Sequence, residues 1–147
     1  MNSENPLVGT WTLVAIRAIA ADGSVDPEAY GPSPVGRLMY TADGYMTVLF
    51  AQGDRPPLSG NPTSPFDLAD VPATERAQAF SSFSAYAGTY TLAGDSVTHH
   101  VAIASIPNRV GTDLVRIVAL EGDRLTLKTP PGRDSLNYFE LVWQKSA

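Results

Sequence analysis

Two adjacent residues, His99 and His100, are the only histidines among the 147 residues of the chain. Neighbouring side chains of a β-strand point to opposite faces, so at most one imidazole can enter a sheet interior, and the pair cannot hold one metal ion together. Alternation with Val97 and Val101 puts His99 on the more apolar face, but which face is the interior stays open. One imidazole could act as a general acid or base near neutral pH; the alternative is a hydrogen-bonded histidine that shapes a cavity.

Arg116 is a lone charge in the otherwise apolar run from Leu114 to Val118. A charged side chain in the middle of a strand needs a partner or water. Facing inward, Arg116 would clamp a carboxylate, enolate or carbonyl oxygen of a ligand; facing outward, it would reach solvent or pair with Glu140. Residues 96–104 and 112–120 are expected to be adjacent antiparallel strands, so a histidine and Arg116 could meet in one cavity. The candidate catalytic residues are therefore His99, His100 and Arg116.

Two tyrosines, Tyr86 and Tyr90, share one face of a predicted strand with Gly88 between them. Tyrosine has an apolar ring and a polar tip, which suits an oxygenated hydrophobic ligand, although it is also a common core residue. Gly88 carries no side chain and is expected to leave open space on that face. The candidate ligand-binding residues are all aromatic: Tyr40, Phe50, Phe83, Tyr86, Tyr90 and Tyr138.

Short apolar segments separated by turn residues must position these side chains. Gly and Pro each occur twelve times, and dipeptides such as Asp43-Gly44 and Gly122-Asp123 mark tight turns. The pattern predicts an all-β fold, an eight-stranded up-and-down antiparallel barrel. The predicted strands cover residues 8–19, 36–42, 45–51, 86–93, 96–104, 112–120, 123–129 and 136–145.

The segment from Gln52 to Asp70 is rich in Pro, Gly, Ser and Asn, which predicts a long surface loop at the mouth of the barrel. One short helix is predicted directly after it, over residues 72–84, because Ala73, Ala77 and Phe80 fall at helical spacing. The middle strands are apolar on both faces, so we expect this helix to pack on the barrel wall or mouth, with the loop as a lid. No linker is evident, and residues 1–147 are expected to form a single domain.

Composition excludes several classes of function. The formal net charge is −5 and the basic residues are scattered, so nucleic acid is not an expected partner. Cysteine is absent, and no phosphate-binding loop or metal-ligand motif occurs, so we expect no cofactor and no metal. The first residues contain no basic segment, and no apolar run approaches the roughly 20 residues that span a bilayer. A cytoplasmic protein without a membrane partner is the expectation.

The segment Leu7-Val8-Gly9-Thr10-Trp11 resembles the Gly-x-Trp signature at the first strand of lipocalins. Over nearly its whole length the chain is similar to the bacterial and fungal lipocalin-like domain family, and the further segments that carry this resemblance include Tyr86 to Tyr90, Ser96 to Val101 and Trp143 to Lys145. The resemblance implies a barrel with an internal cavity, and a basic residue, Lys145 or Arg17, packed across the tryptophan. Some similar proteins act in natural-product pathways, where they bind or rearrange polyketides and terpenoids.

Three functions are compatible with these observations. The first is the binding of a small, largely hydrophobic organic molecule in the barrel. The second is a cofactor-independent isomerase or cyclase of natural-product biosynthesis, with His99 or His100 as proton shuttle, Tyr86 or Tyr90 as co-donor, and Arg116 stabilising an enolate. The third is an interaction module with a filled core and an exposed apolar patch. The oligomeric state, monomer or homodimer, stays open.

Overall fold

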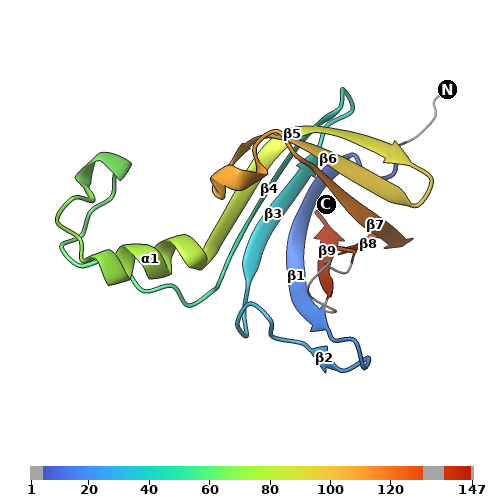
Figure 1. Cartoon of the computed structure of the whole chain (residues 1–147). Helices are drawn as coiled ribbons and strands as arrows, with labels where there is room; N and C mark the ends of the chain where they lie inside the picture. The colour runs from blue at the N-terminus through green and yellow to red at the C-terminus, as the bar shows by residue number, and fades with distance from the viewer. Residues whose placement is uncertain (1–4, 131–137, 147) are drawn as a thin grey trace.

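The computed structural model describes residues 5–130 and 138–146, which fold mainly as β-strands. Nine strands form one antiparallel sheet in the order β2-β1-β3-β4-β5-β6-β7-β8-β9, and β1 also pairs with β9. This pairing closes the sheet into a barrel of eight strands, because β2 contributes only two residues beside the end of β1 (Figure 1). The predicted eight-stranded up-and-down barrel is confirmed.

The strand bounds follow the sequence prediction closely. The strands are β1 (Gly9–Ile19), β2 (Val25–Asp26), β3 (Val35–Tyr40), β4 (Tyr45–Ala51), β5 (Phe83–Ala93), β6 (Ser96–Ala104), β7 (Asp113–Glu121), β8 (Arg124–Lys128) and β9 (Tyr138–Lys145). The short strand β2 was not predicted, β5 begins before its predicted start at residue 86, and the predicted start of the last strand at residue 136 lies outside the described residues. The helical segments are η1 (Pro65–Asp67), α1 (Ala73–Ser81) and η2 (Pro107–Arg109), and no helix in the described part of the chain is long and apolar enough to cross a membrane.

One end of the barrel is filled by the segment that precedes β1. Leu7 is fully buried there, and the indole nitrogen of Trp11 donates a hydrogen bond to its carbonyl oxygen at 2.9 Å. The ammonium group of Lys145 lies 5.4 Å from the centre of the Trp11 ring. Of the two basic residues that the resemblance left open, Lys145 therefore packs across the tryptophan, whereas Arg17 pairs with Glu140 at 3.2 Å.

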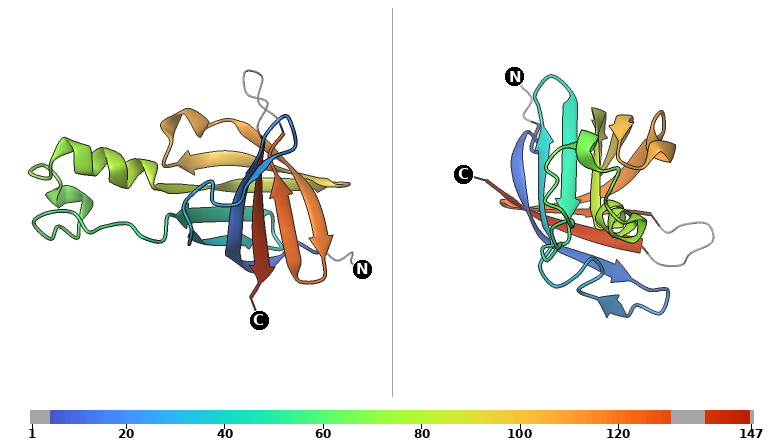
Figure 2. Two further views of the ribbon diagram at one scale, coloured as in Figure 1. Left: turned by 90° about the horizontal axis from the view of Figure 1, so that it is seen from below. Right: turned by 90° about the vertical axis from the view of Figure 1, so that its left-hand side faces the viewer.

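The segment from residue 52 to residue 82 leaves the other end of the barrel as an arm, and Figure 2 shows it extending away from the strands. The arm contains η1 and α1, and none of the helix residues is buried. The prediction that the helix packs on the barrel wall or mouth is therefore wrong. The helix also ends at Ser81, earlier than predicted, because Phe83 already pairs with Ala51 in the sheet.

Gly88 is needed for a close approach between strands. The ladder of β5 and β6 shifts register between Ala87 and Gly88, and a Cβ atom on Gly88 would lie 1.9 Å from the carbonyl oxygen of His100. The expectation that Gly88 opens space for a cavity is therefore wrong, because the backbone of β6 occupies that position.

We expect Gly88→Ala to lower the free energy of unfolding by about 1–3 kcal/mol, because the backbone of β6 must move to admit the methyl group. The exposed neighbour Thr89 offers a control, since Thr89→Ala should cost less than about 1 kcal/mol. Urea unfolding followed by fluorescence measures both values. Equal stability of Gly88→Ala and the unmodified protein would contradict the proposed role of this glycine.

Candidate functional site

A cavity of about 210 Å³ lies inside the barrel, toward the end from which the arm leaves. Apolar side chains from several strands form most of its wall, including Ile16, Leu38, Val48, Phe50, Leu127 and Leu141. Polar groups are set singly among them: Tyr30, Tyr86, His99, Arg109, Arg116, Thr129 and the indole of Trp143. A small, partly open cavity of this composition can bury an apolar molecule and orient it through a few polar contacts.

His99 is the histidine that faces the interior, and only 1% of its surface is exposed. The hydroxyl of Tyr40 lies 2.6 Å from its Nε2 atom, and the hydroxyl of Tyr86 lies 2.7 Å from its Nδ1 atom. A neutral imidazole has one N–H group and one lone pair, so one tyrosine donates to the ring and the other accepts from it. The three side chains therefore form a hydrogen-bonded chain that starts in the core at Tyr40 and ends at Tyr86 in the cavity wall.

The histidine in this chain is neutral at physiological pH. Burial, together with the positive charge of Arg116, lowers the pKa of His99 to about 3. Burial also raises the pKa of Tyr40 and of Tyr86 above the usual phenol value. For Tyr86, the positive charges of Arg116 and Arg109 act in the opposite direction. The hydrogen-bonded side chains of Tyr40, His99 and Tyr86 are thus uncharged. They can pass a proton only by moving it between oxygen and nitrogen along their existing hydrogen bonds.

Two arginines border the same cavity. Arg116 extends inward from β7, and burial lowers the pKa of its guanidinium group below the usual value. Arg109, in η2 between β6 and β7, places its guanidinium carbon 5.3 Å from the centre of the Tyr86 ring. Arg116 does not pair with Glu140, which instead contacts Arg17 at 3.2 Å and Lys128 at 3.7 Å.

The remaining candidate residues lie outside the cavity, except Phe50. His100 faces outward and contacts Asp113 and Thr91, both at 2.9 Å. Tyr90 lies near the filled end of the barrel, where its hydroxyl donates to the carbonyl of Thr41 at 2.7 Å. Phe83 and Tyr138 are half-buried and do not border the cavity. His99, Arg116, Tyr86 and Phe50 are thus the candidates that the fold brings together, with Tyr40 directly behind His99.

Sequence reasoning included neither Arg109 nor Trp143 among the candidate site residues, and both border the cavity. Arg109 follows Pro107 in a short connection, where no strand alternation indicates the direction of a side chain. Trp143 lies on the last strand, β9, and borders the cavity. Its indole nitrogen is buried and has no hydrogen-bond acceptor among the described residues.

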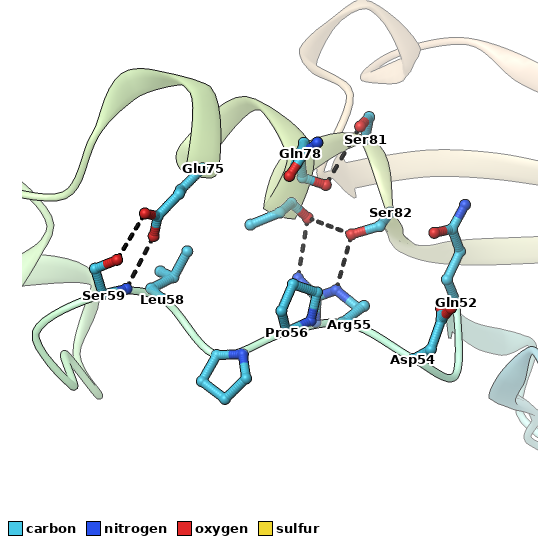
Figure 3. A pocket seen from close by; sticks show the side chains of 12 residues that line it. Gln52, Asp54, Arg55, Pro56, Leu58, Ser59, Glu75, Gln78, Ser81 and Ser82 are labelled. Atoms are coloured by element: carbon cyan, nitrogen blue, oxygen red, sulfur yellow. Dashed lines mark hydrogen bonds between the residues drawn. The ribbon is translucent and has the colours of Figure 1, made fainter.

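A second hollow, of about 520 Å³, lies on the arm between residues 52–59 and α1. Figure 3 shows that its polar side chains bind one another. Arg55 donates to the hydroxyl of Ser82 at 3.0 Å, and the hydroxyl of Ser59 lies 2.6 Å from a carboxylate oxygen of Glu75. These contacts hold the two sides of the arm together, so we assign the hollow to the structure of the arm and not to ligand binding.

Within residues 5–130 and 138–146, no group of three or more His, Asp or Glu side chains is arranged to hold a metal ion.

We expect the buried His99 to make stability depend on pH. In the unfolded chain its imidazole binds a proton below about pH 6.5, whereas in the folded protein it stays neutral down to about pH 3. The unfolded state holds more protons in this window, so the free energy of unfolding falls as the pH drops from 6.5 toward 3, by up to about 1.4 kcal/mol per pH unit.

Urea unfolding at pH 7 and pH 5 measures this effect. The unmodified protein should lose about 2 kcal/mol more than His99→Gln, because glutamine keeps hydrogen-bonding groups but does not titrate. The outward His100 supplies the control variant His100→Gln, which should retain the loss. A direct measurement on the unmodified protein is the nitrogen chemical shift of the His99 ring, and a change of that shift between pH 8 and pH 5 would contradict a neutral buried imidazole.

Comparison with known proteins places this barrel in a family. No curated protein gives a significant match to the chain. One solved structure matches the chain over most of its length. It is the crystal structure of a mutant of the fluorescent protein UnaG, with 14% sequence identity, coverage of 96% of each chain and a TM-score of 0.41. A model of the lipocalin-like domain matches residues 8–146. The chain, with its closed eight-stranded barrel and internal cavity, therefore belongs to the lipocalin-like domain family.

Proposed function

We propose that the protein binds a small, largely hydrophobic organic molecule in the barrel cavity. The observation that carries this proposal is the hollow of about 210 Å³ that persists inside an otherwise packed barrel. A core that served stability alone would be filled, because each void forfeits packing contacts. The third function considered from the sequence, an interaction module, required a filled core, so the cavity disfavours it.

The wall of the cavity supports a skeleton that is mostly carbon with a few oxygens, of the polyketide or terpenoid type. Phe50, Leu127 and Leu141 offer apolar contact, while the hydroxyl of Thr129 and the two guanidinium groups offer hydrogen bonds to oxygen. The volume lies below the range of roughly 300–1,000 Å³ typical for drug-sized ligands. A one- or two-ring compound is therefore the expected size.

Binding can be tested by native mass spectrometry and isothermal titration against a panel of small hydrophobic metabolites. We expect one ligand per chain, and we expect larger side chains in the cavity to weaken binding by roughly tenfold or more, since they remove the space that the ligand fills. Two cavity-filling variants, Ala29→Trp at the mouth and Leu141→Phe inside, guard against the failure of either one to fold. The control is Ala119→Trp on the exposed face of β7. Equal binding by filled and unfilled barrels would contradict the cavity as the binding site.

A second candidate function is a cofactor-independent isomerase or cyclase, and the hydrogen-bonded chain Tyr40–His99–Tyr86 favours it. Tyr86 lies in the cavity wall with His99 directly behind it. The oxygen of Tyr86 would take the proton from a carbon of the substrate while its own proton moves to Nδ1 of His99, and the reverse transfer would return a proton to another carbon. Arg116, beside the same cavity, would stabilise negative charge on a ligand oxygen as a carbon–hydrogen bond is broken. In this reaction Tyr86 is the group that contacts the substrate, and His99 acts through it.

Proton transfer can be detected without knowledge of the product. A bound carbon acid, incubated with the protein in D₂O, should exchange its acidic C–H hydrogen for deuterium, and Tyr86→Phe should slow this exchange by about 10²–10⁴-fold. His99→Gln should slow it as well and alter its pH profile, whereas Tyr45→Phe on the exposed outer wall should not. If the bound carbon acid exchanged deuterium no faster than it does in buffer alone, the isomerase function would be contradicted, and ligand binding would stand as the function.

A further inference from the structure

The charge of the cavity wall identifies the kind of ligand more narrowly. Arg109 and Arg116 both border the cavity, and no Asp or Glu is among the residues that line it. The chain as a whole carries a formal net charge of −5. The lining of the cavity has the opposite sign of charge, because it contains two cationic side chains and no anionic one.

The carboxylates of neighbouring strands do not reach these arginines. Asp113 precedes Arg116 by three residues on β7, so the alternation of side chains turns it to the outer face, where it contacts His100 at 2.9 Å. Glu140 on β9 contacts Arg17 and Lys128. Among the described residues no carboxylate lies within ion-pair distance of Arg116 or Arg109.

An enclosed guanidinium group without an anionic partner is unfavourable, because its charge has lost part of its hydration and gained no ion pair in return. Arg116 donates a hydrogen bond, at 3.1 Å, to the carbonyl of its neighbour Val115, and its guanidinium group also lies beside the side chain of Tyr86, where a hydrogen bond from it opposes the rise in pKa that burial causes. Neither partner is a carboxylate, so the positive charge has no counter-charge, and further donors of the five-donor group remain for a ligand. Trp143, on the same wall, has a buried indole N–H without an acceptor among the described residues. The cavity therefore holds an excess of donors that a ligand must satisfy.

We infer that the ligand is an organic anion with two oxygens in one plane, a carboxylate or the enolate of a 1,3-dicarbonyl, which Arg116 and Arg109 bind inside the barrel. The planar fork of a guanidinium group matches two coplanar oxygens, and the ion pair supplies the missing counter-charge. The apolar body of the ligand then lies against Phe50, Leu127 and Leu141. This inference rests on the proposed function, since it describes the head group of a molecule bound in that cavity.

The test compares acids with their own esters, which share an apolar body and differ in charge. The probes are 2-naphthoic acid, geranic acid and the methyl ester of each, and dissociation constants are measured by isothermal titration at pH 7.5. We expect the acids to bind roughly 10- to 100-fold more tightly than the esters. Arg116→Met, which keeps length and apolar volume, should remove this preference and retain ester binding. Arg109→Met should reduce the preference, and Arg124→Met, on the outside of β8, should leave it unchanged.

The melting temperature of the ligand-free protein gives a second test of the inference. If Arg116 lacks an anionic partner in the free protein, Arg116→Met should leave the melting temperature unchanged or raise it. A marked fall in melting temperature, or equal affinity for acids and esters, would overturn the inference while the proposed function stood. Failure of every acid, ester and metabolite of the wider panel to bind would instead overturn the proposed function itself.

Discussion

The pairing of β1 with β9 is the contact on which the interior of this protein depends. It runs from Trp11 opposite Lys145 to Ile19 opposite Tyr138, and it joins strands from the two ends of the chain. Without it the sheet would keep two open edges, and its inner face would be exposed to water. With it, every strand of the barrel has one face turned to a common interior, so the side-chain alternation of eight strands becomes the wall of one enclosed space.

The two ends of that space are treated differently, and this difference produces the cavity. At one end Leu7, which precedes β1, is fully buried, and the indole of Trp11 donates a hydrogen bond to its carbonyl oxygen. At the other end the chain leaves the barrel as the arm, and Tyr30, whose ring lies 5.4 Å from that of Phe50, covers the mouth only in part. The interior is therefore packed where the chain supplies side chains to fill it and hollow where it does not.

A buried polar group lowers the stability of a protein unless its donors and acceptors form hydrogen bonds or ion pairs. His99 is bonded at both ring nitrogens by Tyr40 and Tyr86, so its burial is compensated and its neutral form is fixed. On the same wall, and among the described residues, Arg116 has no carboxylate partner and the indole N–H of Trp143 has no acceptor. The first arrangement stabilises the barrel by itself. The second leaves donors for a ligand, which is why recognition is proposed at the arginines and not at the histidine.

The sequence alone determined the strands, their tight turns, and the rule that only one of His99 and His100 can face inward, because these follow from local propensity and from the period of two along a strand. The same period describes both faces of a sheet equally well, so only closure of the barrel decided that His99 and Arg116 share the interior and that His100 lies outside. The positions of Arg109 and of the arm depend on where the connecting segments leave the strands. The requirement for glycine at position 88 depends on how closely the backbone of β6 approaches β5. Those features are contacts between residues distant in the sequence or placements without local periodicity, and tertiary structure alone sets them.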